Sequence, residues 1–165
     1  MNTTIREAHA ADIPAMMDIF WEHITQSPEY ISHGEMQMGV ADFSGKPTVQ
    51  GKEKWLAYIR QCLSSKKTQV MVAEIDGTIG GFSIISINND GGANYGMLND
   101  ILISSKMRGK GIGSKLLEED LAWFAKQGLK TLYLESGKNN HAAHDFFERH
   151  GFLLTSYIFR TEIAS

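Results

Sequence analysis

Cysteine and long apolar runs are scarce in this sequence, and each shortage excludes a class of protein. Cys62 is the one cysteine among 165 residues, so the chain cannot form an internal disulfide, and a reducing compartment is favoured. No apolar run reaches the ~20 residues that a membrane-spanning helix needs. The opening residues, MNTTIREAHAADIP, lack the apolar core of a signal peptide. The sequence therefore predicts a cytoplasmic protein with no membrane partner.

An excess of one charge is also missing. Lysine and arginine number 16, and aspartate and glutamate number 19, which gives a formal net charge of −3. Broad electrostatic capture of nucleic acid needs a basic surface, so nucleic acid is not expected as a partner. The length lies within the roughly 100–200 residues of one domain, and neither a repeat nor a linker is evident. We therefore expect a single domain over residues 1–165.

Hydrophobic periodicity divides the chain into strands and helices. Asp76-Gly77 indicates a hairpin turn, whereas residues 26–51 show no sustained period and are expected to form a functional or mobile loop. The element order predicts an α/β fold, with a single mixed, mostly antiparallel sheet flanked by helices on both faces. Helices are expected to begin near residues 12, 52, 112 and 140, and strands are expected at 3–8, 69–75, 79–87, 97–104, 131–136 and 152–163.

A glycine-rich turn, RGKGIG at 108–113, follows the fourth expected strand and leads directly into a helix. Glycines allow successive backbone N–H groups to turn toward a ligand, and a helix N-terminus adds unpaired donors and partial positive charge. The combination favours a phosphate or pyrophosphate site, although a tight turn with solvated basic residues has the same composition. The patterns GxxxxGK[ST] and GxGxxG are absent, which speaks against a P-loop and a dinucleotide-binding fold.

The same turn resembles the signature of the GNAT superfamily of N-acetyltransferases. The family pattern [Q/R]xxGx[G/A] is matched by Arg108, Gly111 and Gly113, and a hydrophobic strand at 98–103 precedes it. With the order of elements, the resemblance extends over residues 3–163. It implies the GNAT-like acyl-CoA N-acyltransferase fold, with acetyl-CoA as cosubstrate and direct transfer of its acetyl group to a primary amine.

A second family element supports this resemblance. The pattern NxxAxxFYxxxGF aligns with residues 140–152, where phenylalanine replaces the family's tyrosine at position 147. By resemblance, the pantetheine arm of the coenzyme would pair with strand backbone, and its pyrophosphate would lie in the glycine turn. The residues so implied are Ile101, Leu102 and Ile103 for pantetheine, Arg108, Gly109, Lys110, Gly111, Ile112, Gly113 and Ser114 for pyrophosphate, and Asn140 and Phe147 for the thioester end.

The catalytic residues of the family are replaced here. An alkylamine with a pKa of about 10.4 is mostly protonated at neutral pH, so a base is needed, but the position of the family's strand glutamate is Asn99. Asp100 is the first candidate base, although strand alternation points it to the opposite face unless a bulge intervenes. Glu135 is a second candidate, and an amine that arrives neutral is a third route. Tyr157 could replace the tyrosine missing at Phe147, or the thiolate could leave unassisted.

The acceptor site is expected between the first two helices, where the family places its specificity elements. His23, Tyr30, His33 and Glu35 lie in this part of the chain and are the candidate substrate-binding residues. They would take a small-molecule or peptide amine. No metal is expected, because the histidines lack a supporting pattern of ligands.

The sequence leaves open two alternative functions and the possibility that the protein pairs with a second copy of itself. The residues at positions 99 and 147 suggest a non-catalytic coenzyme A-binding or sensor module as an alternative to the enzyme. A nucleotide-binding module that uses the turn for ATP is a third hypothesis. The segment 152–163 is long for a single edge strand and could pair with a second copy, which favours a homodimer.

Overall fold

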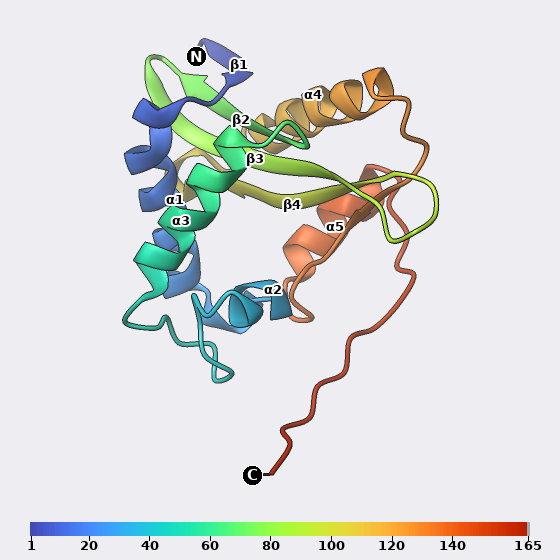
Figure 1. Ribbon diagram of the computed structural model, residues 1–165. Helices are drawn as coiled ribbons and strands as arrows, with labels where there is room; N and C mark the ends of the chain where they lie inside the picture. Colours follow the sequence, from blue (N-terminus) through green and yellow to red (C-terminus); the bar gives the residue numbers. More distant parts are fainter. Residues whose placement is uncertain (165) are drawn as a thin grey trace.

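A five-stranded sheet with helices on both faces forms the centre of the computed structural model, which describes residues 1–164 (Figure 1). The strands lie in the order β1-β2-β3-β4-β5, and all neighbours are antiparallel except the parallel pair β4–β5. The predicted mixed, mostly antiparallel sheet is confirmed. The strands are β1 (Thr3–Glu7), β2 (Thr68–Ile75), β3 (Thr78–Asn88), β4 (Tyr95–Ile103) and β5 (Leu132–Leu134).

The helices follow the sequence periodicity closely. Within residues 1–164, none has both the length and the apolar composition needed to cross a bilayer. The segment 26–51, expected to be a loop, contains one short α-helix and one 3₁₀ turn. The helices are α1 (Ile13–Gln26), α2 (His33–Gln37), α3 (Gly51–Ser64), α4 (Ile112–Lys126) and α5 (His141–Arg149), with 3₁₀ turns η1 (Ala10–Asp12), η2 (Pro28–Tyr30) and η3 (Ser105–Met107).

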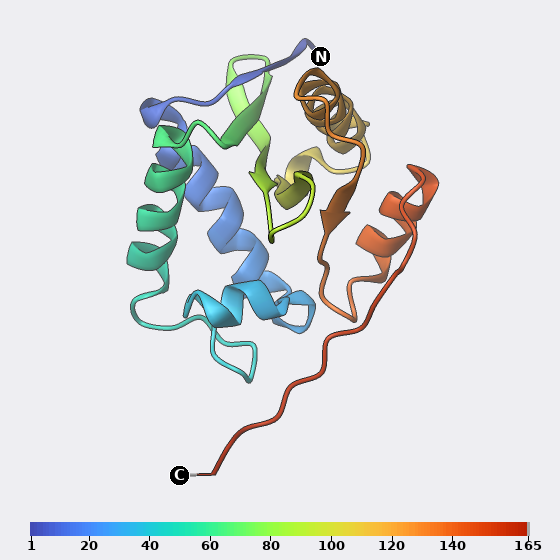
Figure 2. The same ribbon diagram turned by 45° about the vertical axis from the view of Figure 1, so that its right-hand side comes forward.

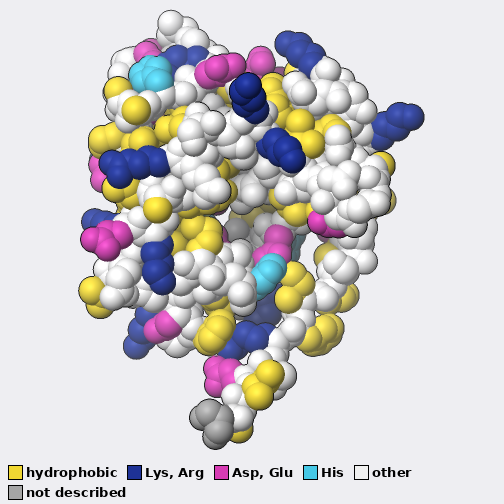
Figure 3. Space-filling view, in the orientation of Figure 1, with side chains coloured by type: hydrophobic (Ala, Val, Ile, Leu, Met, Phe, Trp, Pro, Cys, Tyr) yellow, Lys and Arg dark blue, Asp and Glu magenta, His cyan; other side chains and the backbone are white. Residues whose placement is uncertain are grey.

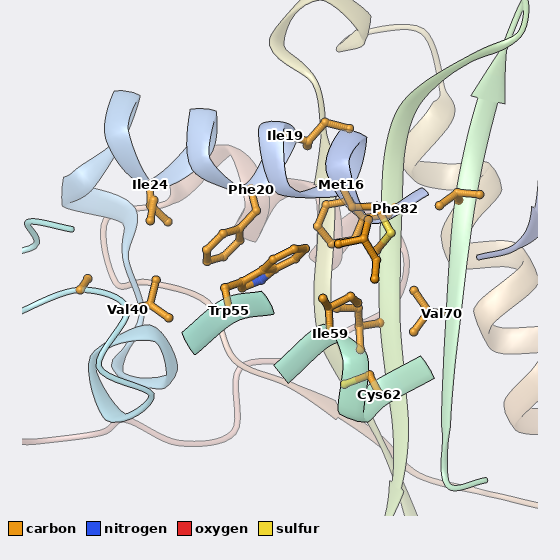
Figure 4. Packing of buried hydrophobic residues seen from close by; sticks show 14 of the residues in the cluster. Met16, Ile19, Phe20, Ile24, Val40, Trp55, Ile59, Cys62, Val70 and Phe82 are labelled. Atoms are coloured by element: carbon orange, nitrogen blue, oxygen red, sulfur yellow. The ribbon is translucent and has the colours of Figure 1, made fainter. Parts of the chain in front are cut away.

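Helices α1 and α3 cover one face of the sheet. The ring of Phe20 on α1 stacks on Trp55 of α3 at 4.8 Å between centroids, and Trp55 meets Phe82 of β3 edge to face at 6.0 Å (Figure 4). All three side chains are almost fully buried. Aromatic pairs of this kind add about 0.5–1.5 kcal/mol each beyond their burial, so this contact fixes both helices against the strand.

Helices α4 and α5 lie on the opposite side of the sheet (Figure 2). Leu117 and Phe124 of α4 pack with Leu98 of β4, and Phe147 of α5 joins the same buried cluster. The Phe147 ring contacts Phe152 at 5.6 Å. Because both helices bury side chains against β4, their ends are held in a defined position beside that strand.

The last expected strand does not form. In the described part of the chain, residues 152–164 have no strand pairing, and they extend away from the helices and the sheet (Figures 1 and 2). The prediction of a strand at 152–163 is wrong for this chain in isolation. Aromatic and β-branched residues such as Tyr157, Ile158 and Phe159 give the segment strand propensity. A strand also needs a neighbour with free hydrogen-bonding groups.

A buried carboxyl group lies between α4 and β3. Asp120 is fully buried, and its Oδ1 accepts a hydrogen bond of 2.9 Å from Ser83 Oγ, whereas Oδ2 has no partner among the described residues. Burial raises the pKa of Asp120 to about 7, and the bond from Ser83 opposes the rise. In the unfolded chain the pKa would be about 3.9. The folded state therefore binds the proton more tightly, and stability falls as pH rises from about 4 to about 7.

We predict that Asp120→Asn makes the protein less sensitive to alkaline pH. Above pH 7 the ionised Asp120 carboxylate lowers the free energy of unfolding by on the order of 4 kcal/mol. This value is the pKa difference between the folded and unfolded states multiplied by 1.36 kcal/mol per pKa unit. Urea unfolding gives the difference in unfolding free energy between the variant and wild type at each pH. We expect this difference to be more favourable to the variant at pH 8 than at pH 4, by about 1 kcal/mol or more. Glu118→Gln, on the exposed side of α4, is the matched control. Parallel stability curves for wild type and Asp120→Asn would contradict the prediction.

Candidate functional site

Strands β4 and β5 separate part of the way along the sheet. They pair only where Gly96, Met97 and Leu98 face residues 132–134, whereas β4 continues to Ile103. Ser104 N donates to Gly80 O at the β3 side. By the alternation of an antiparallel ladder, the backbone groups of Ile101 and Ile103 then face the open side, and those of Leu102 face β3. The open edge therefore offers two of the three residues that the sequence assigned to pantetheine.

A β-bulge reverses the expected direction of Asp100. Ile84 pairs with Asp100 and Ile85 pairs with Leu98, so Asn99 is the extra residue. Leu98 points into the cluster under α4, whereas the Asp100 side chain contacts α3. Simple alternation would have placed both on one face. Asp100 could serve as the base only if a bulge intervened in the strand, and that bulge is present.

The Asp100 carboxyl group lies in a partly buried acidic environment. Tyr58 Oη of α3 donates to Asp100 Oδ2 over 3.3 Å. Burial raises the pKa of Asp100 well above its usual range, the negative charge of Glu35 raises it further, and the hydrogen bond from Tyr58 opposes the rise. Burial beside Asp100 also raises the pKa of Tyr58, so its phenol remains protonated. Sequence reasoning missed Tyr58, because no motif links a residue of α3 to β4.

The α2 segment lines the same opening from the other side. Glu35 accepts hydrogen bonds from the backbone N–H and the hydroxyl of Ser32, which forms a capping box at the start of α2. His33 Nδ1 pairs with Glu135, which follows β5. The space-filling view shows a hollow on this face with histidine and acidic side chains at its rim (Figure 3). The predicted residues His33, Glu35 and Glu135 are thus brought to one side of the opening.

A close backbone contact holds this segment against the β5–α5 connection. A Cβ at the buried Gly137 would lie 1.9 Å from the carbonyl oxygen of Tyr30 and 3.3 Å from that of Ile31, so only glycine fits there. The Gly137 carbonyl in turn accepts a hydrogen bond from His144 Nε2 over 3.0 Å. The contact holds η2 directly against the chain after β5, beside the opening.

The glycine turn presents backbone donors with no internal partner. Within residues 1–164, no hydrogen bond uses the N–H groups of residues 109–114. Gly109 and Gly111 have φ of 73° and 74°, a left-handed conformation that side chains rarely adopt, and a Cβ on either would meet open space. The turn thus provides the geometry expected for an anion site at the start of α4.

Charged residues beside the glycine turn make hydrogen bonds to β4 and, through Ser105, to α1. Arg108 Nε donates to the carbonyl of Ile103 over 3.1 Å. Glu22 of α1 accepts hydrogen bonds from the backbone and hydroxyl of Ser105, which lower the pKa of Glu22. Burial and, to a smaller extent, the positive charge of Arg108 lower the pKa of His23. His23, a candidate for the acceptor pocket, is therefore a partly buried side chain within reach of the charge of Arg108.

The other residues predicted for the thioester end and for acid catalysis lie at a helix cap, in the core and on an exposed segment. Asn140, expected at the thioester end of the coenzyme, caps α5, with Oδ1 accepting from the N–H of Ala143 over 3.3 Å. Phe147 is only 8% exposed, which places it in the core and not at an open surface. Tyr157 lies on the extended C-terminal segment and is 75% exposed. The expectation that Tyr157 stands on a sheet strand near the reaction centre is therefore wrong, because that strand does not form.

Metal-ligating residues do not converge in the described chain. Among residues 1–164, no three His, Cys, Asp or Glu side chains gather closely enough to hold an ion. His141 and His144 meet edge to face at 5.7 Å. Cys62 is buried in the core, and burial raises the pKa of its thiol, which makes it a poor nucleophile.

Curated relatives match between two fifths and two thirds of the chain. A protein described as an uncharacterized N-acetyltransferase of Archaeoglobus fulgidus is 32% identical over 118 residues, which cover 68% of this chain and 76% of the relative. A second, the uncharacterized N-acetyltransferase YhdJ of Bacillus subtilis, is 35% identical over 65 residues, which cover 39% of this chain and 46% of the relative.

Solved structures share the fold at low sequence identity. The aminoglycoside 6'-N-acetyltransferase AAC(6')-Ig of Acinetobacter haemolyticus has a TM-score of 0.72 and 16% identity, over 100% of this chain and 99% of that chain. A protein of Clostridium acetobutylicum described as a predicted acetyltransferase, solved with acetyl-CoA, has a TM-score of 0.75 and 14% identity, over 98% and 96% of the two chains. Acetyl-CoA binding is typical of this fold.

A family model matches the part of the chain that contains the candidate site. The model of the "Acetyltransferase (GNAT) family" matches residues 36–152, which run from α2 past the end of α5. This range contains the bulged strand, the glycine turn and the helix that it opens. The chain therefore belongs to the GNAT family and is an N-acetyltransferase.

Proposed function

We propose that residues 1–165 act as one GNAT domain that transfers an acetyl group from acetyl-CoA directly to a primary amine of a small molecule or peptide. The observation that carries the proposal is the position of Asp100, whose carboxyl group is turned by the bulge toward the acceptor side of β4. The open strand edge that would receive the thioester arm lies on the same strand. Base and acyl donor would thus meet beside a single strand.

The coenzyme would bind along β4 and the turn that follows it. Pantetheine carries amide groups that would pair with the open backbone of Ile101 and Ile103, as an added strand does. This requires Arg108 to release the carbonyl of Ile103, and its guanidinium could then contact a phosphate. The free N–H groups of residues 109–114 would hold the diphosphate. Asn140, which caps α5, is the side-chain candidate for the thioester end.

The reaction would need a proton acceptor in the site and little acid catalysis. The protonated amine would first give one proton to Asp100. The neutral nitrogen would then form a bond to the acetyl carbon, the bond between that carbon and the coenzyme sulfur would break, and the second proton of the nitrogen would pass to solvent. A carboxyl group with a raised pKa suits this role, since a base works best when its pKa lies near the working pH. The leaving thiolate has a parent pKa of ~8.5 and can depart without a general acid. Tyr58, and not Tyr157, is the phenol beside the proposed base.

The acceptor would be a cationic amine. Glu35 and Glu135 lie at the opening with Asp100, and the negative charge of these glutamates favours a positively charged ligand. Glu135 is paired with His33, so it serves better in binding the acceptor than as the base. Several of the structural neighbours are aminoglycoside acetyltransferases, one of them in complex with sisomicin. The cytoplasm remains the predicted compartment.

We also infer that the protein forms a homodimer through its C-terminal segment. Six large apolar side chains on this segment are exposed, and nothing in the described chain covers them. A contiguous apolar segment of this kind marks an interaction surface, and strand propensity without a partner favours pairing with another chain. The residues are Leu153, Leu154, Tyr157, Ile158, Phe159 and Ile163, which are 60–93% exposed.

The function is tested by measuring thiol release from acetyl-CoA with a panel of primary amines, alongside calorimetric titration with coenzyme A. We expect binding of coenzyme A, and thiol release above the hydrolysis background only when a suitable cationic amine is present. Binding without release for the whole panel would favour a non-catalytic coenzyme A module. Absence of binding, together with stabilisation by ATP, would overturn the assignment of the turn.

The proposed base is tested by Asp100→Asn. We expect kcat/KM to fall roughly 10²-fold and the acidic limb of the pH–rate profile to disappear. Tyr58→Phe should move that limb to higher pH, because the lost hydrogen bond opposes the rise in the pKa of Asp100. Asp145→Asn on the exposed side of α5 is the control. An unchanged profile in Asp100→Asn would exclude this residue as the base.

The homodimer is tested by light scattering on the purified protein. We expect a dimer for wild type and a monomer for the double variant Leu154→Lys with Phe159→Lys, because two charges would disrupt the apolar surface. Thr155→Lys with Thr161→Lys adds the same charge at exposed polar positions of the segment and should remain dimeric. A monomeric wild type at micromolar concentration would refute the inference.

A further inference from the structure

A hydrogen-bonded pair connects the start of α4 with the end of α5. His150 Nε2 lies 3.1 Å from Ser114 Oγ, and His150 Nδ1 lies 2.8 Å from the carbonyl oxygen of Phe146. The His150 ring also packs on the Phe146 ring, with 4.4 Å between centroids. Ser114 and His150 are both partly buried. The ring is thus fixed on three sides, next to the last residue of the free backbone donors at 109–114.

The partners of His150 determine where its proton lies. A carbonyl oxygen can only accept a hydrogen bond, so the contact with Phe146 requires a proton on Nδ1. In the neutral ring, Nε2 then carries no proton and must accept its hydrogen bond from Ser114. A serine hydroxyl has a single hydrogen to donate. In the neutral state of His150 that hydrogen is therefore directed at the histidine and away from the glycine turn.

A second proton on the ring reverses this bond. Nε2–H then donates to Ser114 Oγ, and the hydroxyl hydrogen becomes free to donate to another acceptor. A phosphate oxygen in the turn would gain a hydrogen bond from Ser114 and a nearby positive charge at the same time. With the neutral ring, the same phosphate oxygen would meet a hydroxyl whose hydrogen is already in use.

We propose that His150 is a positioning residue for the diphosphate of coenzyme A, acting through the hydroxyl of Ser114. The proposal rests on the coenzyme site proposed above. Coenzyme binding and protonation of His150 would favour each other, because linkage between two binding events is reciprocal. No residue of the family motifs marks His150, since its role arises only where α5 ends beside α4.

Other charged side chains lie near this pair in the sequence. Lys110 and Lys115 flank the start of α4, Glu118 lies one turn after Ser114 along α4, and Arg149 precedes His150 at the end of α5. A bound diphosphate would offset the positive charges, which strengthens the expected link between anion and proton.

The test compares coenzyme A titrations of wild type, His150→Gln and Ser114→Ala by calorimetry at pH 5.5 and pH 8, each in two buffers of different ionisation enthalpy. The two buffers give the number of protons taken up on binding. Coenzyme A has titrating groups of its own, which are the same in every titration and cancel in the comparison. We expect wild type to take up more protons than His150→Gln and to gain about tenfold more affinity between pH 8 and pH 5.5.

His150→Gln and Ser114→Ala should both lose this additional pH dependence of coenzyme A affinity. The double variant should show the same affinities as either single variant. Ser114→Thr keeps the hydroxyl and should restore the pH dependence, which a merely structural role would not predict. Thermal unfolding checks that each variant is folded, and Ser114→Ala provides the test if His150→Gln is not. Equal proton uptake in wild type and both variants would overturn the proposal while leaving coenzyme binding intact. Absence of coenzyme A binding in wild type would instead overturn the proposed function.

Discussion

The divergence of β4 from β5 is the constraint on which the candidate site depends. The two strands pair over three residues, and the backbone of β4 beyond that point keeps a neighbour on one side only. A parallel pair would ordinarily continue along both strands, but the chain turns away after Leu134. Unpaired backbone groups at a sheet edge attract another strand or an extended ligand. The cofactor arm, the base and the acceptor would all meet at this edge.

The bulge at Asn99 and the contact at Gly137 lie on the two chain segments that diverge. One extra residue turns Asp100 to the face of the sheet that α3 covers, where burial and Glu35 raise its pKa. Across the opening, Gly137 lets the chain after β5 touch the backbone of Tyr30. The proposed chemistry would occur between two layers, one carrying Asp100 and one carrying the His33–Glu135 pair. Neither layer contains the whole site.

The helices behind the sheet hold the other end of the site. Helix α4 packs against β4 through Leu117 and Phe124, and α5 packs on the same cluster through Phe147. The phenylalanine at this position, unusual for the family pattern, is part of the core. These contacts fix where α4 begins and where α5 ends, so the pairing of Ser114 with His150 follows from apolar packing. Ser114 and His150 meet beside the glycine turn because of where the two helices place them, and not because a motif marks these residue types.

The sequence by itself determined the element order, the class of sheet and the glycine turn, because hydrophobic period, hairpin residues and left-handed glycines act over a few positions. It also brought Asp100, Glu135, His33 and Glu35 into consideration. Only the tertiary structure decided that Asp100 faces α3, that Tyr58 is its neighbour and that residues 152–163 lack a strand partner in this chain. Bulges, ion pairs and strand partners depend on residues far apart in the chain, and a local pattern carries no information on which of them meet.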